Sequence, residues 1–425
     1  MTQKVELKRE LGLLEVTLAG VGIILGAGIY ALIGKAAGLT GNSVWLSFAI
    51  SALVAVFTGL SYAELSSMFP KASAEYEYTS NAFGKKLAFI IGWLIILSAV
   101  IGASTVALGF GGYFNAFFKV SSATSGFFLI IALSFLLFYG IKESAWFAII
   151  STLIETAGLL IVIFIGLPYF GKVDYFDMPL GLPGVFQAAA LVFFAYTGFE
   201  SIAKLSEETK APEKTIPKGL ILSIIISIIL YVLVAISAVS VVGWEKLASS
   251  QAPFAELAYA VFGSKGFILL SVIALFATAN TVLMMLLGSS RIMYGMADSS
   301  TLPNILARVH PSRRTPWVAI LITMILSLLF IFAGDIAFVA NVDNFTLFVT
   351  FFVINAAMIV LRYKEPDLRR PFMVPLSIGK FPVLPLFGIL FCIFMISQLE
   401  LKVLLTGIIL VVLGGLFSLV EMKKG

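Results

Sequence analysis

Apolar runs long enough to cross a lipid bilayer recur along the whole sequence, and they constrain its fold more than any other feature. About 20 apolar residues span the hydrocarbon core as a helix. The strands of a membrane barrel would instead show short segments of alternating polarity, so helices are the expected spanning element. We expect twelve transmembrane helices, at 13–36, 43–66, 86–115, 124–141, 145–170, 184–207, 217–243, 264–291, 316–333, 344–362, 381–398 and 402–421.

The composition excludes most soluble and metal-dependent classes of protein. Hydrophobic residues make up 60% of the 425 residues and charged residues 12%, with a mean hydropathy of +1.06. A soluble domain of this composition would expose too much apolar surface. The chain has one histidine, His310, and one cysteine, Cys392, too few ligands for a zinc or haem site. We expect an all-α integral membrane protein forming a single membrane domain over 1–425, with no metal, no cofactor and no enzymatic activity.

The basic residues in the connections predict the orientation in the membrane. If the N-terminus lies in the cytoplasm, 22 of the 28 lysines and arginines fall on the cytoplasmic side, including Lys4, Lys8 and Arg9 before the first span and Lys423 and Lys424 after the last. This bias follows the positive-inside rule. It predicts an even number of spans with both termini in the cytoplasm, in the cytoplasmic membrane. It also accounts for the net charge of +5 without a nucleic-acid partner.

Two of the expected spans contain glycines where a helix can break. The first span, in GVGIILGAGIY, contains Gly20, Gly22, Gly26 and Gly28, and the sixth, in FFAYTGFESI, contains Thr197 and Gly198. Glycine lets the backbone leave helical geometry, although small residues four apart, such as Gly22 and Gly26, are also typical of close helix packing. Interruptions at corresponding places in two halves of a chain indicate a transporter binding site.

A pair of broken helices can bind a small zwitterion without charged side chains. Each break leaves unpaired N–H groups on one side and unpaired carbonyls on the other. The N–H end suits a carboxylate, and the carbonyl end suits an ammonium group or a sodium ion. An α-amino acid carries both charges. Breaks near the midplane in both halves also favour an occluded site over the continuous pore of a channel.

Five motifs occur along the chain in a fixed order. They are GAGIY, YAELSSMFPKASAEYEY, AYTGFESI, SEETKAPEKTIPKG and GSSRIMYGMADSSTLP, beginning at residues 26, 62, 195, 206 and 288. Over nearly its whole length the chain resembles the amino acid–polyamine–organocation transporters, closest to prokaryotic cationic amino acid transporter-like members. The resemblance implies a leucine-transporter type fold, with two inverted repeats of five helices at 13–170 and 184–362 and two peripheral helices at 381–421. It implies amino acid transport by alternating access with proton-coupled symport. Exchange of amino acids or polyamines and sodium-coupled symport are the alternatives.

The resemblance also implies which atoms contact the substrate. Backbone N–H groups are expected to hold the carboxylate at Ala27, Gly28 and Ile29. Carbonyls are expected to hold the amine near Ile23 and Ile24 and at Phe194, Ala195 and Thr197. Gly26 and Gly198, at the two interruptions, complete this set. Phe199 is expected as a gate or pocket wall, and the third, eighth and tenth spans are expected to complete the side-chain pocket.

Glu155 is the strongest candidate among the ionisable residues within the expected spans. It lies near the middle of the fifth span, where charged groups are costly and usually functional. A protonated glutamic acid making one hydrogen bond is the structural alternative, since desolvation favours the neutral acid. The resemblance places Glu155 where some proton-coupled members have a lysine that is thought to stand in for a sodium ion. The coupling ion therefore stays open, because Glu155 would either carry a proton or bind sodium with Asn280 or Thr281 of the eighth span.

Two further acids belong to the motifs. Glu64 lies near the cytoplasmic end of the second span and is expected to hold the connection that follows. Glu200 follows the break in the sixth span by two residues and is expected either to cap a half-helix or to line the inner vestibule. The outer connections carry little acid beyond Glu245, Glu256 and Asp335, so cationic, neutral and mixed substrates all stay open.

Overall fold

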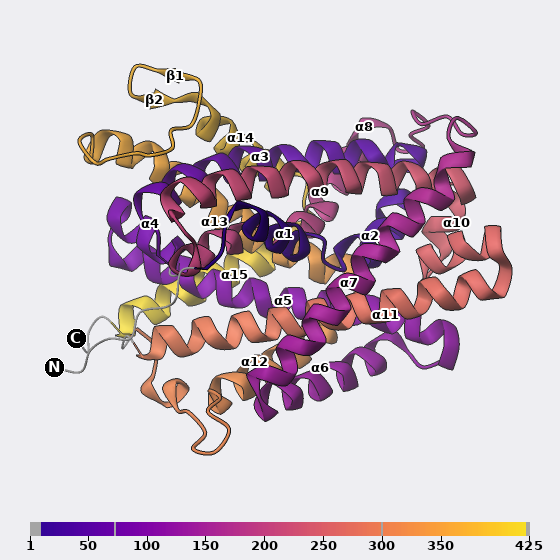
Figure 1. Ribbon diagram of the computed structural model, residues 1–425, viewed down its shortest axis with the longest axis horizontal. Coiled ribbons are helices and arrows are strands. Elements are labelled where there is room, and N and C mark those ends of the chain that lie inside the picture. The colour runs from indigo at the N-terminus through magenta and orange to yellow at the C-terminus, as the bar shows by residue number, and fades with distance from the viewer. Residues whose placement is uncertain (1–9, 72–73, 299–300, 422–425) are drawn as a thin grey trace.

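The computed structural model describes residues 10–71, 74–298 and 301–421, and these residues are mostly helical (Figure 1). Two short strands, β1 (Ser377–Ile378) and β2 (Phe381–Pro382), form an antiparallel hairpin in which Ser377 lies opposite Pro382. The basic residues expected to flank the spans at the two ends of the chain, Lys4, Lys8, Arg9, Lys423 and Lys424, lie outside the described residues.

Each expected apolar segment coincides with one helix or with a set of two or three interrupted helices. The helices are α1 (Leu13–Ile24), α2 (Gly28–Thr40), α3 (Val44–Met68), α5 (Lys85–Phe118), α6 (Ser122–Tyr139), α7 (Ile141–Gly166), α8 (Gly181–Val192), η3 (Phe193–Tyr196), η4 (Phe199–Glu208), α9 (Pro212–Val242), α11 (Pro253–Asp298), α12 (Trp317–Ile331), α13 (Ile336–Lys364), α14 (Val383–Ser397) and α15 (Leu401–Glu421). Short helices in the connections are η1 (Gly41–Ser43), α4 (Ala74–Phe83), η2 (Leu167–Tyr169), α10 (Trp244–Ser249) and η5 (Asn304–Ala307).

By length and composition, nine helical stretches within the described residues can cross a membrane. Three further apolar helices, α1, α12 and α14, are shorter. The chain is therefore a multi-pass membrane protein. In this count α2, η1 and α3 form one stretch, Gly28–Met68. The expected total of twelve spans stays a prediction.

One expected boundary differs from the structure in a way that bears on the site. We expect the tenth span to begin at residue 344, but α13 begins at Ile336. The Asp335 side chain caps the helix, because its Oδ1 accepts a hydrogen bond of 2.9 Å from the Phe338 N–H. An N-cap of this kind stabilises the first turn. As a result, Asp343 lies two turns inside the helix rather than in a connection.

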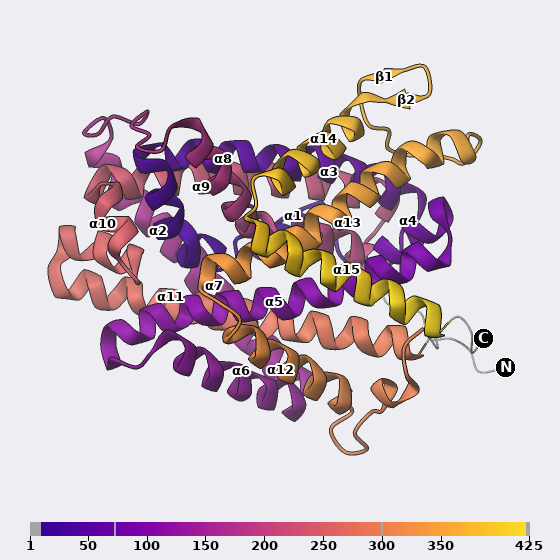
Figure 2. The same ribbon diagram turned by 180° about the vertical axis from the view of Figure 1, so that it is seen from behind.

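The interrupted helices lie in the interior of the bundle. In Figures 1 and 2, α1 lies in the middle of the bundle between α3 above and α5 below, and it packs against α9 and η4. Its close approach to α9 requires glycine, since a Cβ on Gly20 would collide with the Ser223 side chain. Small residues thus allow α1 and α9 to pack closely, as is typical of helix interfaces in membranes.

The connections divide between the two ends of the bundle. The hairpin β1–β2 and α4, both expected on the cytoplasmic side, lie at one end in Figure 1, and α10, expected outside, lies at the other. This separation agrees with alternating spans. Which end faces the cytoplasm is inferred from the basic residues alone.

Candidate functional site

The first interruption falls at the glycines of the first expected span. Helix α1 ends at Ile24 and α2 begins at Gly28. Between them the Gly26 N–H donates to the Ile24 carbonyl at 2.6 Å, a tight turn that ends helical bonding. The N–H groups of Gly28 and Ile29 donate to no acceptor within the described part of the chain, as expected for the first turn of a helix. This end of α2 can therefore receive a carboxylate.

The second interruption follows η3. Thr197 is extended and Gly198 has a φ of 109°, a conformation that strongly favours glycine. The carboxylate of Glu200 caps the turn, because its Oε2 accepts a hydrogen bond of 2.9 Å from the Gly198 N–H. Glu200 also lines a cavity beside this turn. Glu200 therefore caps this turn and lines the cavity, and its expected place in the inner vestibule stays a prediction.

The two interruptions lie against each other. A Cβ on Gly28 would come within 2.7 Å of the Ala195 Cα, so only glycine allows this approach. The Tyr231 hydroxyl of α9 lies 2.5 Å from the Ile24 carbonyl oxygen and 2.9 Å from that of Ala195. One hydroxyl thus bridges the carbonyls of both breaks. Each carbonyl keeps a second lone pair for another donor.

The cavity beside the two interruptions has a volume of about 740 Å³. Of the predicted site residues, those that line it are Ile23, Ile24, Gly26, Gly28, Phe194, Ala195, Thr197, Gly198, Glu155, Asn280, Thr281 and Glu200. Those that do not are Ala27, Ile29, Phe199 and Glu64. The predicted residues of the first, fifth, sixth and eighth spans therefore meet around one space.

Two of the predicted residues outside the cavity lining, Ala27 and Phe199, have other contacts. The Ala27 N–H donates to Thr281 Oγ1 at 3.0 Å, so this amide already has an acceptor. Phe199 is buried in an aromatic cluster, with ring centroids 5.9 Å from Tyr62 and 5.2 Å from Phe351. Because it packs away from the cavity, Phe199 does not form a pocket wall in this structure.

Glu155 lies in a polar cluster between α7, α11 and the first interruption. Its side chain is 1% exposed, and its Oε1 has no hydrogen-bond partner within the described residues. The Asn280 amide lies beside the carboxyl group and also donates to Thr152 Oγ1 at 3.1 Å. The Tyr30 hydroxyl of α2 donates to the Glu155 carbonyl at 3.0 Å. The cluster connects a buried acid directly to the broken helix.

Residues that sequence reasoning missed also line the cavity, namely Ser98, Thr152, Lys204 and Asp343. Lys204 forms an ion pair of 3.5 Å with Glu75 of α4. Asp343 is fully buried, and neither of its carboxylate oxygens has a hydrogen-bond partner among the described residues. The sequence does contain a feature that could have placed Asp343 inside the span. The apolar run before it, IAFVANV, extends the span by two turns.

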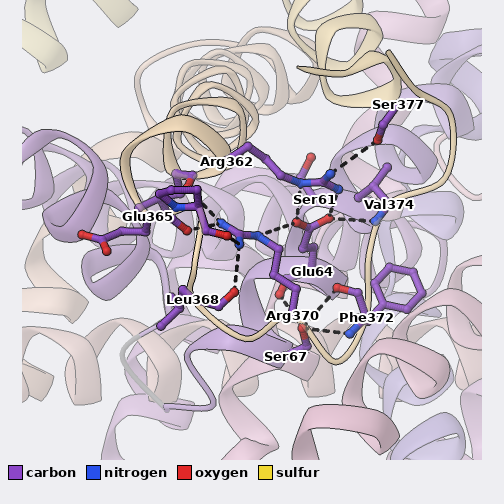
Figure 3. Close-up of polar contacts among 12 residues, drawn as sticks. Ser61, Glu64, Ser67, Arg362, Glu365, Leu368, Arg370, Phe372, Val374 and Ser377 are labelled. Atoms are coloured by element: carbon purple, nitrogen blue, oxygen red, sulfur yellow. Dashed lines mark hydrogen bonds and ion pairs between the residues drawn. The ribbon is translucent and has the colours of Figure 1, made fainter. Parts of the chain in front are cut away.

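Glu64 belongs to a separate buried ion-pair cluster at the end of α3 (Figure 3). Its two carboxylate oxygens accept hydrogen bonds of 2.7 and 2.6 Å from Nε and Nη2 of Arg362. Oε1 lies 3.3 Å from Nε of Arg370, and Oε2 accepts a bond of 2.7 Å from the Val374 N–H. Within the described residues, Glu64 therefore holds the connection after α13. The expectation that it holds the connection after its own helix, which includes residues outside the described ranges, stays a prediction.

Known proteins are similar to this chain over most of its length. The family described as amino acid permease matches residues 11–415. The chain is similar to the branched-chain amino acid permease BcaP of Bacillus subtilis, at 34% identity over 92% of this chain and 88% of the relative. It is also similar to the methylthioribose transporter of Bacillus subtilis, at 30% identity over 98% and 94% of the two chains. Vacuolar cationic amino acid transporter 4 of Arabidopsis thaliana is 29% identical over 85% of this chain and 64% of the relative.

Proposed function

The chain belongs to the amino acid permease family, and on this premise we propose that it moves amino acids across the cytoplasmic membrane by proton-coupled symport. The family and the relatives are transporters, not enzymes. The observation that carries the proposal is the meeting of two helix interruptions beside a buried acid, Glu155, in one cavity. Alternating access then requires the cavity to open to each side of the membrane in turn.

The proposed architecture has twelve spans with both termini in the cytoplasm. Two inverted repeats of five helices occupy 13–170 and 184–362, and two peripheral helices follow at 381–421. In support, the interruptions fall in the first helix of each proposed repeat, between α1 and α2 and after α8.

The substrate is proposed to bind by its main-chain charges. The carboxylate would accept hydrogen bonds from the N–H groups of Gly28 and Ile29, which have no acceptor in the described chain. The amine would donate to carbonyls at Ile23 and Thr197, with the second lone pairs of Ile24 and Ala195 in reach. The Ala27 N–H already donates to Thr281 Oγ1. It would therefore donate to the substrate carboxylate only if that hydrogen bond breaks.

Glu155 is proposed to carry the coupled proton. The groups that face it are Tyr30, Tyr231 and Asn280, with no basic side chain among them. A carboxyl group in such surroundings is stable when neutral and costly when charged. Protonation from outside would accompany substrate binding, and release inside would follow opening to the cytoplasm. Sodium symport is the second candidate, because Asn280 lies beside the same acid and Thr281 lines the same cavity.

The test is uptake of a panel of labelled amino acids into liposomes containing the purified protein. Accumulation above equilibrium that requires an acid-outside gradient, in sodium-free buffer, is the expected result. Dependence on sodium or on internal amino acid would replace proton symport by sodium symport or exchange. If sealed vesicles with folded protein took up no amino acid, the substrate assignment would be wrong.

Replacing Tyr231 by phenylalanine should weaken substrate binding about tenfold, measured as a rise in KM for uptake. The change removes the donor that bridges the Ile24 and Ala195 carbonyls. Leaving a buried acceptor unpaired costs about 1–3 kcal/mol, so the two interruptions would no longer be held in the geometry that receives the amine. The matched control is Tyr113→Phe. Tyr113 is equally buried, but its hydroxyl donates to the Tyr30 carbonyl inside α2. Equal KM values in the two variants would show that the bridge has no role in binding.

A further inference from the structure

Asp343 is a buried carboxyl group with no basic partner among the described residues. Its side chain is 0% exposed, and both Oδ1 and Oδ2 lack a hydrogen bond within the described residues. Buried polar groups are nearly always satisfied, so an exception calls for an explanation. Asp343 lines the same cavity as the two interruptions, which makes a bound ligand the natural partner.

The neighbours of Asp343 include a glycine and a flexible side chain. A Cβ on Gly102 of α5 would come within 2.9 Å of Met285 Sδ and 3.2 Å of Asp343 Oδ2, so glycine brings α5 close to the carboxylate, and the flexible Met285 side chain lies beside it. Ser98, one turn earlier on α5, lies beside Asp343 and offers a hydroxyl. The cavity wall nearby is apolar, with Ile95 and Met285. The subsite therefore combines an acid, a hydroxyl and a surface for methylene groups.

The charges around the cavity also favour a cationic ligand. Among the described residues that line it, Glu155, Glu200 and Asp343 are acids and Lys204 is a base. Lys204 is already paired with Glu75, and Glu200 accepts a bond from the Gly198 N–H. A zwitterionic amino acid has no net charge, and the interruptions account for both of its charged groups. Asp343 is therefore available to pair with a further positive charge on the substrate.

We propose that Asp343, with Ser98, binds the positively charged group at the end of the substrate side chain, so that the permease prefers cationic amino acids. The inference rests on the proposed function and adds the substrate class. A charge-assisted hydrogen bond to the ammonium or guanidinium group would pair the buried acid, and the methylene stem would lie on the apolar wall. A branched-chain substrate would leave Asp343 unpaired and be disfavoured.

The experiment compares uptake of L-lysine with that of L-norleucine, which has the same carbon chain without the terminal ammonium group. In wild-type proteoliposomes, kcat/KM should be at least about tenfold higher for lysine. Asp343→Asn should bring this ratio close to unity by reducing lysine uptake while norleucine uptake is kept or increased. Asp335→Asn, the same substitution at the exposed cap of the same helix, should leave the ratio unchanged.

Two outcomes would overturn the inference. One is wild-type norleucine uptake that equals or exceeds lysine uptake, and the other is an Asp343→Asn variant that loses both substrates in equal proportion. If Asp343→Asn does not fold, Ser98→Ala provides the same readout and should lower the lysine-to-norleucine ratio severalfold. Failure of the proposed function would look different, since no amino acid would then enter wild-type vesicles.

Discussion

Replacing Glu155 by glutamine should abolish accumulation driven by a proton gradient while leaving exchange of labelled for unlabelled amino acid intact. Glutamine keeps the shape of the side chain and its hydrogen-bonding partner Asn280 but cannot take up a proton. Binding and reorientation of the loaded carrier would still occur, because the substrate contacts at the interruptions are unchanged. Reorientation coupled to proton transfer would be lost, so uptake should stop at equilibrium.

Gradient-driven accumulation and exchange should both be measured on the same vesicles, in sodium-free buffer. Glu256→Gln is the matched control, since Glu256 lies on α11 outside this cavity and next to a second, smaller pocket. It should accumulate substrate as the wild type does. Continued accumulation by Glu155→Gln would exclude Glu155 as the proton carrier. Loss of exchange together with accumulation would instead assign Glu155 a structural role.

Both helix interruptions could be predicted because their causes are local in the sequence. Gly198 has a positive φ, and Gly28 lies against the Ala195 backbone, where a side chain would not fit. In both places glycine is required by backbone geometry, and glycine in a long apolar run is visible without a structure. Most of the candidate residues near these glycines therefore line the cavity, although their neighbours Ala27, Ile29 and Phe199 do not.

The contacts between interruptions and other helices could not be predicted, because they join residues far apart in the chain. The Tyr231 hydroxyl reaches Ile24 across 207 positions, and Ala27 donates to Thr281 across 254. Nothing in the pattern of a single sequence pairs such residues. The position of the Phe199 side chain could not be predicted either, since an aromatic residue beside a break can face the cavity or pack into the core.

Asp343 was missed for a different reason. A polar pair, Asp343 and Asn344, looks like the end of a connection when a span is drawn by hydropathy. The cap at Asp335 and the packing of α13 against α5 carry the helix through these residues. The Asn344 amide then donates to the carbonyls of Ala190 and Leu191 at the end of α8. Tertiary contacts outweigh hydropathy at this position.

Replacing Glu64 by glutamine should strongly destabilise the protein. Glu64, Arg362 and Arg370 are all buried, and their side chains are 1%, 5% and 7% exposed. Arg370 also donates to backbone carbonyls of the connection after α13, including Leu368 (Figure 3). Removing the one acid leaves two arginines without a counter-charge. Breaking a buried ion pair in this way costs about 3–5 kcal/mol.

Cys392 allows this loss of stability to be measured directly. It is the only cysteine in the chain and is buried in α14, so a thiol-reactive dye reports when the purified protein unfolds on heating. Glu64→Gln should lower the melting temperature by about 5 °C or more. The control is Glu77→Gln, which removes an exposed ion pair of 3.3 Å with Lys71 and should have little effect, since such pairs contribute about 0–1 kcal/mol. Similar melting temperatures for the two variants would mean that Arg362 and Arg370 find other partners. The connection after α13 would then be held by its backbone contacts and not by the carboxylate of Glu64.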